Sequence, residues 1–135
     1  MSRAYYRGMD YRRAITIEDL RRIARRRLPN FSFEYVEGGA EDEVTLRRNR
    51  DVFERFGWLP RALVGAGPPD LATELFGKPV SMPVVVAPTG FNGLLWPQGD
   101  IALAKAATAA GIPFTLSTAG NCSIKRLSAA VPGNL

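Results

Sequence analysis

Residues 83–131 follow an order of strand, helix, strand and helix, and this order constrains the fold more than any other feature. Residues 83–87 and 112–118 are short apolar runs that predict two buried strands. An alanine-rich helix is predicted to end at Gly111, and a second helix is predicted to begin after Ser123. Because both predicted strands are apolar on both faces, they are typical of parallel strands covered by helices. The order therefore predicts an α/β fold.

Two parallel strands do not make a complete sheet, since both edges stay open and half of each face stays uncovered. The last residues, 129–135, are typical of a connection into a third strand. We therefore expect the chain to be the N-terminal piece of a larger α/β protein. The alternative is a small compact domain in which the N-terminal helices close the sheet.

A helix is predicted to begin at Ile17, ahead of the strands. Thr16 is a good capping residue, and Asp19 three residues later makes an imperfect capping box. Apolar residues recur on one face of this segment, and Pro29 is expected to end it.

Two further helices are predicted before the strands begin. The first covers residues 31–37, and Gly38-Gly39 is expected to supply the positive φ that a helix end often needs. The second covers residues 40–56. Its acidic residues, 41–43, are expected in the first helical turn, where they suit the helix dipole.

The segment between these helices and the strands is predicted to be mostly irregular. Residues 58–70 are rich in proline and glycine and indicate a long connection. Gly77-Lys78 then lies between two short extended runs, which predicts a small hairpin.

The positive charge of the chain is concentrated near its N-terminus. The net charge is +5, and residues 1–30 hold nine arginines against Asp10, Glu18 and Asp19. Such a segment is typical of a solvated helix face or of a contact with another part of the protein. Contact with a membrane surface or with nucleic acid is the alternative.

The sequence lacks two residue types on which many catalytic sites depend. It has no histidine, which excludes a histidine-ligated metal site or a histidine-assisted nucleophile built from this chain alone. Cys122 is the single cysteine, so an internal disulfide is excluded and a reducing compartment is favoured. No apolar run reaches the length of about 18 residues expected of a membrane span. We expect a cytoplasmic protein.

Two segments with small residues follow the predicted strands. Pro88, Thr89 and Gly90 follow the first strand, and Ser117 to Gly120 end the second. In parallel α/β sheets, ligands bind beyond the carboxyl ends of the strands, and small residues let backbone approach a ligand closely. The alternative is a pair of ordinary turns. Neither segment matches a phosphate-binding loop.

Other candidate residues each have a plainer interpretation. Tyr35 combines an apolar ring with a hydroxyl that can donate to a carboxylate, although a core aromatic with its hydroxyl at the surface is the simpler interpretation. The acids at 41–43 could serve acid/base chemistry or bind metal, although helix charges are the simpler interpretation. Cys122 could be activated at a helix start, although an idle thiol is the simpler interpretation. Trp96 is expected to pack above the strand ends.

Taken together, these segments resemble the FMN-dependent α-hydroxy acid dehydrogenase and oxidase family. The resemblance is carried by "FEYVEGGAEDEVTLRRNRDVF" and by "MPVVVAPTGFNGLLWPQGDIALAKAATAAGIPFTLSTAGNCSI". It runs from about residue 16 to the end of the chain with few gaps. Within the family, the segments are most similar to the mandelate-oxidising dehydrogenases, and the flavin-dependent lactate dehydrogenases come next.

The resemblance implies a (β/α)₈ TIM barrel of which this chain holds the N-terminal helices, the hairpin and the first two βα units. Residues 1–15 would then be a flexible basic N-terminus and residues 16–135 the N-terminal portion of the barrel domain. Pro88, Thr89 and Gly90 match the strand-one segment that lies against FMN, with the Gly90 N–H towards flavin N5. Ser117 matches the strand-two hydroxyl that bonds to the flavin ring.

The resemblance also implies a substrate and an electron acceptor. Tyr35 matches the tyrosine that binds the carboxylate side of a 2-hydroxy acid. Ala119 stands where some relatives carry a bulky tryptophan, which would leave room for a larger, mandelate-like substrate. Gly90 stands where many oxidases carry alanine, and so favours a dehydrogenase that passes electrons to a quinone-like acceptor. Full-length relatives are commonly tetramers, and some lie at the inner face of the cell membrane.

The departures from the family concern the reacting groups. The catalytic histidine, the arginines that hold the carboxylate and a lysine near the flavin lie in later strands of the family, so no catalytic residue is assigned here. The phosphate site is built by the loops after strands seven and eight. We therefore expect the chain alone to be inactive and to bind FMN weakly. The alternatives are a flavin-type L-lactate dehydrogenase, a glycolate or lactate oxidase, and an inactive truncated or split-gene fragment that acts only by association. A nucleic-acid-binding module in residues 1–30 is a weaker alternative.

Overall fold

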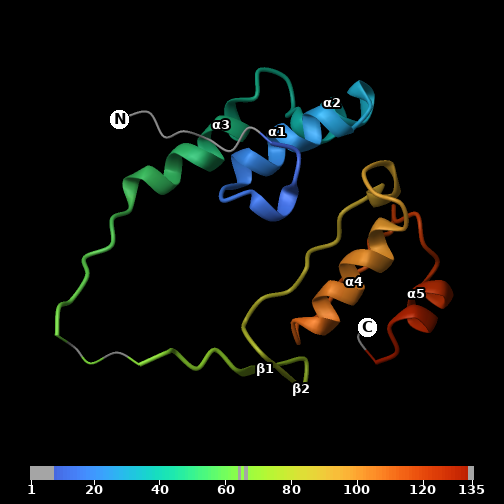
Figure 1. Ribbon diagram of the computed structural model, residues 1–135. Helices are drawn as coiled ribbons and strands as arrows, with labels where there is room; N and C mark the ends of the chain where they lie inside the picture. Colours follow the sequence, from blue (N-terminus) through green and yellow to red (C-terminus); the bar gives the residue numbers. More distant parts are fainter. Residues whose placement is uncertain (1–7, 64, 66, 134–135) are drawn as a thin grey trace. The chain divides into compact units, whose positions relative to one another are not determined.

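The computed structural model describes residues 8–63, residue 65 and residues 67–133 of the chain. The predictions for residues 1–7 and 134–135 lie outside these described residues. The chain divides after Arg61 into two compact units, which are considered separately below. The first unit is helical, and the second contains the hairpin, the strand-like segments and two further helices (Figure 1).

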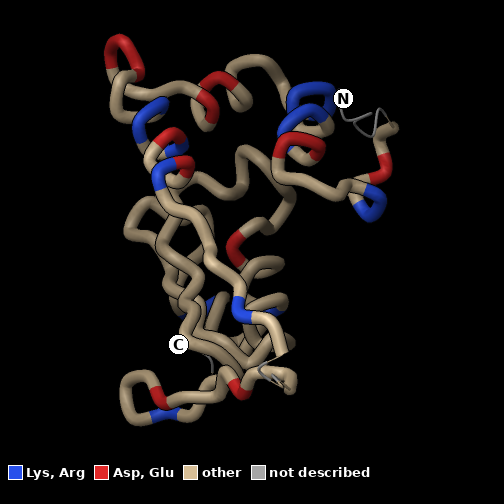
Figure 2. The backbone as a smooth tube through the Cα atoms, turned by 90° about the vertical axis from the view of Figure 1, so that its left-hand side faces the viewer, with Lys and Arg blue, Asp and Glu red and all other residues tan. Residues whose placement is uncertain are grey.

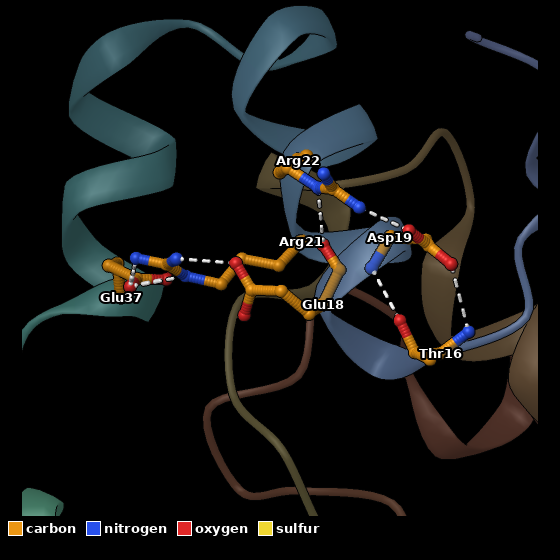
Figure 3. Close-up of polar contacts among 6 residues, drawn as sticks. All are labelled: Thr16, Glu18, Asp19, Arg21, Arg22 and Glu37. Atoms are coloured by element: carbon orange, nitrogen blue, oxygen red, sulfur yellow. Dashed lines mark hydrogen bonds and ion pairs between the residues drawn. The ribbon is translucent and has the colours of Figure 1, made fainter. Parts of the chain in front are cut away.

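Short helices make up the first unit. They are the 3₁₀-helix η1 (Tyr11–Arg13), the α-helices α1 (Ile17–Arg27), α2 (Asn30–Glu37) and α3 (Val44–Asp51), and the 3₁₀-helix η2 (Val52–Arg55). The predicted start of α1 is confirmed. The Thr16 hydroxyl accepts the Asp19 N–H at 3.1 Å, and the Asp19 carboxylate accepts the Thr16 N–H at 3.1 Å (Figure 3). Asp19 therefore completes a capping box in spite of its short side chain.

The predicted role of Gly38-Gly39 is wrong. Gly38 follows α2 with φ −73° and ψ 150°, an extended conformation that any residue can adopt, and Gly39 does not have a positive φ either. The left-handed residues of this connection are Glu41 and Glu43, at φ 49° and 56°. The chain therefore leaves α2 extended and turns only just before α3.

The third helix was predicted to begin at residue 40, but it begins four residues later. α3 starts at Val44, so the acids at 41–43 precede the helix and do not occupy its first turn. The left-handed conformation of Glu41 and Glu43 is the physical reason, since a right-handed helix cannot contain such residues. The α-helical part also ends at Asp51 and continues as η2.

The second unit begins with irregular chain and a hairpin, as predicted. β1 (Thr73–Leu75) and β2 (Lys78–Val80) pair antiparallel, with Leu75 opposite Lys78. The turn residues are therefore Phe76 and Gly77, both with positive φ, rather than the predicted Gly77-Lys78, because Lys78 pairs with Leu75 in the hairpin. This conformation matches the right-handed twist of the flanking strands, and it is what two-residue hairpin turns favour.

The two predicted parallel strands are confirmed only at their centres. Val86 forms a parallel bridge with Phe114, in which the Val86 N–H donates to the Pro113 carbonyl at 2.9 Å and the Thr115 N–H donates to the Val86 carbonyl at 3.0 Å. Pro88 comes next in this ladder and has no N–H to donate, so the ladder ends there. Among the described residues, no longer parallel strand forms.

The prediction that both strands are buried is wrong for the first of them, and in the second it holds only at Phe114. Val84 and Val85 are 47% and 39% exposed, whereas Phe114 is buried. Such a strand is buried only when neighbours flank it and layers cover both of its faces. The Val85 and Ala87 N–H groups, which face away from the bridge, donate to no described residue. This edge of the strand pair is open within the second unit.

Two helices pack over the bridged segments and form the core of the second unit. α4 (Gly99–Ala109) is followed by Gly111, and α5 (Ile124–Ala130) is capped by the Ser123 hydroxyl, which accepts the Arg126 N–H, as predicted. A short 3₁₀-helix, η3 (Asn92–Leu94), precedes α4. The buried core residues come from both helices and from the second strand segment: Ile101, Ala104, Ala107, Phe114, Leu127 and Val131.

Candidate functional site

The loops that follow the two bridged segments lie against each other. The Phe91 N–H donates to the Ala119 carbonyl at 3.0 Å. A Cβ atom placed on Gly90 would lie 3.2 Å from the Ala119 Cβ, which is tighter than ordinary packing. Gly90 therefore allows the two loops to approach closely, and the parallel order brings these predicted site residues together at one end of the strands.

Several polar groups at this end are available to a ligand. The Gly90 N–H donates to no described residue. The Ser117 hydroxyl accepts the Ala119 N–H at 3.1 Å, and among the described residues it has no acceptor for its own proton. Pro88 and Ala119 are exposed beside them. The arrangement offers two donors next to a surface without large side chains, which suits a flat ligand with polar edges.

The side chain of Thr89 bonds within its own loop. Its hydroxyl donates to the Asn92 Oδ1 at 2.9 Å, and the Asn92 amide donates back to the Thr89 carbonyl at 3.0 Å. The hydroxyl therefore orders the loop, and the backbone of Thr89 is the part left to contact a ligand.

A buried polar network beneath these loops was missed by sequence reasoning. Asp100, in the first turn of α4, is only 2% exposed, and Asn92 is 7% exposed. The Asn92 amide donates to Asp100 Oδ1 at 2.8 Å, and the Asn121 N–H donates to Asp100 Oδ2 at 3.0 Å. An acid at a helix start is common on the surface, so no local pattern indicated that this acid is buried.

Tyr35 belongs to the first unit, whereas the other predicted site residues belong to the second. It lies on α2, and 61% of its surface is exposed. The alternative that Tyr35 is a core aromatic is therefore wrong within its unit. Trp96 is also exposed, at 54%, rather than packed.

The basic segment of the first unit pairs with acids of the same unit. Arg21 contacts both Glu18 and Glu37, and Arg22 contacts Asp19, the latter a buried acid (Figure 3). The Arg25 Nη1 atom lies 3.7 Å from the Glu34 Oε1 atom. Figure 2 shows acidic positions close to the basic ones along this part of the chain. Three arginines of the segment, Arg21, Arg22 and Arg25, are thus paired with acids of their own unit, which favours a contact within the protein at these three positions.

Two acids of this unit have lowered pKa values. Burial by itself raises the pKa of Asp19, but hydrogen bonds from the Ile15 and Thr16 N–H groups and the Thr16 hydroxyl, together with the nearby Arg22 charge, lower it overall. The hydrogen bond from Arg21 lowers the pKa of Glu37, and the pKa of Arg21 is correspondingly raised. Both acids are therefore ionised at neutral pH and are poorly suited to act as general bases.

The remaining candidates do not form a catalytic or metal site. No group of three or more acids, cysteines or histidines is gathered among the described residues. Glu43 accepts the Gly39 N–H at 3.1 Å and serves the turn before α3. Cys122 packs against the core of the second unit, as expected of an idle thiol. In the described part of the chain, no helix is long and apolar enough to cross a membrane.

Known proteins match the chain over most of its length. It is 50% identical to the (S)-mandelate dehydrogenase of Pseudomonas putida over 119 residues, and 46% identical to a putative L-lactate dehydrogenase of Mycobacterium tuberculosis over 119 residues. These alignments cover 88% of this chain but only 30% and 29% of the relatives, so the chain spans about a third of their length.

Solved structures of similar proteins match the chain as well. The structure of a "monotopic membrane protein (S)-mandelate dehydrogenase" superposes with a TM-score of 0.81 at 50% identity, covering 87% of this chain and 31% of that one. The fold is the first part of a (β/α)₈ barrel, as predicted. A family profile described as FMN-dependent dehydrogenase matches residues 24–135. The chain therefore belongs to the FMN-dependent dehydrogenase family.

Proposed function

We propose that this chain supplies one wall of the site of an FMN-dependent enzyme that oxidises a mandelate-like 2-hydroxy acid to the 2-oxo acid. The observation that carries the proposal is the close approach of Gly90 and Ala119 at the strand ends, with the Gly90 N–H unengaged. The identity of 50% to a mandelate dehydrogenase supports the choice of substrate class.

The residues at the strand ends fit a flavin ring. Pro88, Thr89 and Gly90 would hold it through their backbone, and the Ser117 hydroxyl would bond to it. When bound, FMN supplies an acceptor for two electrons. The unengaged N–H of Gly90 can stabilise the negative charge that such an acceptor gains, because a fixed donor costs no reorganisation during the reaction.

Two residues would bind the substrate. Tyr35 is 61% exposed, and a tyrosine hydroxyl can donate to the carboxylate of a 2-hydroxy acid. Ala119 is exposed and small, and would leave space for an aromatic ring beside the flavin site. A bulkier residue at position 119 would disfavour mandelate and favour smaller hydroxy acids.

We expect the group that takes the substrate's proton to lie outside this chain. The chain has no histidine, and the lowered pKa values of Asp19 and Glu37 make these acids weak bases at neutral pH. The role of the chain is therefore binding and orientation. Both hydride transfer and a carbanion route are compatible with this role.

The finer features of the proposal concern acceptor, assembly and location. Gly90 favours a quinone-like electron acceptor over oxygen. The working enzyme would be a homotetramer in the cytoplasm. Attachment to the inner face of the cell membrane is part of the proposal, since one solved relative is called a monotopic membrane protein. The division into a flexible N-terminus over residues 1–15 and a barrel portion from residue 16 stays a prediction.

Two other functions fit some of the observations. A flavin-type L-lactate dehydrogenase is favoured by the identity of 46% to a putative enzyme of that kind, and a glycolate or lactate oxidase would share the same loops. An inactive fragment that acts only by association is favoured by the open strand edge at Val85 and Ala87.

The test compares the chain alone with the chain joined to the rest of a barrel. We expect the 135-residue chain alone to purify without stoichiometric flavin and without turnover of mandelate. A fusion to the portion of the P. putida mandelate dehydrogenase beyond the matched region is expected to bind flavin and to oxidise mandelate faster than lactate or glycolate. A soluble fusion without flavin would contradict the proposal, and faster turnover of lactate would favour the second function.

A further inference from the structure

One side chain connects both strand-end loops to the start of α4. Asp100 Oδ1 accepts a hydrogen bond from the Asn92 amide at 2.8 Å, and Oδ2 accepts the Asn121 N–H at 3.0 Å. Asn92 follows the first bridged segment and Asn121 follows the second. Two loops that are distant in sequence are therefore bound to the same carboxyl group.

The network extends from Asp100 towards the surface. The Asn92 side chain exchanges two hydrogen bonds with Thr89, which adjoins Gly90. On the other side, the Asn121 Oδ1 accepts the Gly93 N–H at 2.9 Å. The Asp100 carboxyl is thus bonded to Asn92, and Asn92 in turn is bonded to Thr89, the neighbour of Gly90.

The backbone ladder cannot hold these loops together. It ends at Pro88, which has no N–H, so the segments beyond it lack the regular bonds of a parallel sheet. The Phe91 N–H bond to the Ala119 carbonyl is a direct backbone bond between the loops, and the bonds to Asp100 lie beneath it. Beyond Pro88, the buried Asp100 carboxyl connects the two loops through its hydrogen bonds to Asn92 and Asn121.

We propose that Asp100 is a positioning residue that fixes the Gly90 loop against the Ala119 loop, and so sets where the Gly90 N–H points. The flavin part of this inference rests on the proposed function. A carboxylate suits the position because both loops present donors to it, and each of its oxygens can only accept. An asparagine at position 100 would turn an NH₂ group towards one of these donors.

The first test needs no flavin. Amide hydrogen exchange is measured by NMR on the 135-residue chain and on its Asp100→Asn and Asp100→Ala variants. We expect protection at the Phe91, Gly93 and Asn121 N–H groups to fall by about tenfold in both variants, the loss of about one hydrogen bond. Protection within α4 is expected to change less.

The matched control is Ala107→Gly on the same helix. It weakens α4 without touching the network, so protection should fall evenly across the second unit. An even loss in the Asp100 variants, or unchanged protection at Phe91 and Asn121, would overturn the inference. Absence of protection at these groups in the unaltered chain would overturn it as well.

The second test measures the reduction potential of the bound flavin. In the fusion described above, Asp100→Asn is expected to shift the flavin reduction potential to a more negative value, because the Gly90 N–H is no longer held in place. Ala107→Gly is expected to leave the potential unchanged. A potential that does not move in Asp100→Asn overturns the positioning role. A parent fusion without flavin overturns the proposed function instead, and the exchange measurement still decides whether Asp100 joins the loops.

Discussion

Asp19 in the first unit and Asp100 in the second are both buried carboxyl groups in the first turn of a helix, each 2% exposed. Their partners differ. Asp19 accepts the Ile15 and Thr16 N–H groups, four and three positions away, whereas Asp100 accepts from Asn92 and Asn121, eight and 21 positions away. One acid therefore organises a single helix start, and the other joins separate segments of a unit.

This difference has an energetic consequence. Capping bonds such as those of Asp19 form within one turn, and their loss frays one helix end. The bonds of Asp100 form only when three segments are already in place, so their loss leaves buried donors unpaired in several segments. Changes in the second network should therefore reach farther than changes in the first.

The largest effect is expected from the core on which α4 and its network rest. Leu127 is fully buried, and Leu127→Ala should destabilise the second unit by about 2–5 kcal/mol, from lost burial and the cavity left behind. Urea denaturation followed by circular dichroism measures this. Leu46→Ala, at a partly exposed position of α3, is the control. Equal losses from the two variants would show that the second unit has no cooperative core.

The second prediction addresses the network itself. Asn92→Ala removes a donor to Asp100 and should destabilise the second unit by about 1–3 kcal/mol, because buried polar groups lose their partners. Asn49→Ala, at an exposed position of α3, is expected to change the stability by less than about 0.5 kcal/mol. If both variants had the same stability in urea, the buried network would contribute nothing.

A smaller loss of stability, confined to the start of α1, is expected when the Asp19 capping box is broken. Thr16→Ala removes the hydroxyl that caps α1 and should cost about 1 kcal/mol. Hydrogen exchange should show the loss in the first turn of α1 and no change in the second unit. Thr45→Ala, at an exposed position within α3, serves as the control. A loss of protection in both units would contradict the local character of the Asp19 network.

The smallest expected effect is a pH dependence of the first unit. The folded pKa of Asp19 is lowered, so its ionised form contributes stability above its unfolded pKa of about 3.9, and this stability is lost as pH falls through the folded value. Thermal unfolding of the chain and of Asp19→Asn should therefore differ most above about pH 4 and converge in stronger acid. Parallel curves for the two proteins would show that Asp19 does not titrate with unfolding.

Local features of the fold were predicted from the sequence where neighbouring residues decide them. The Thr16 cap, the Ser123 cap and the hairpin all depend on contacts within a few positions. The errors arose where local patterns were ambiguous. Gly38-Gly39 was expected to turn the chain, but Glu41 and Glu43 adopt the left-handed conformation instead.

The candidate site was predictable in part for the same reason. Pro88, Gly90 and Ser117 follow apolar runs, and the parallel order alone places such residues at one end of the strands. The exposure of Val84 and Val85 was not predictable, because it depends on which segments flank and cover the strand.

By itself, the sequence determined the order of the elements, the Thr16 and Ser123 helix caps, the end of the ladder at Pro88 and the absence of a histidine. These follow from the chemistry of single residues and their near neighbours. Only the tertiary structure decided that Asp100 is buried and that it joins the Asn92 and Asn121 loops. Burial and long-range hydrogen bonds depend on which distant segments pack together, and no local pattern in the sequence records that.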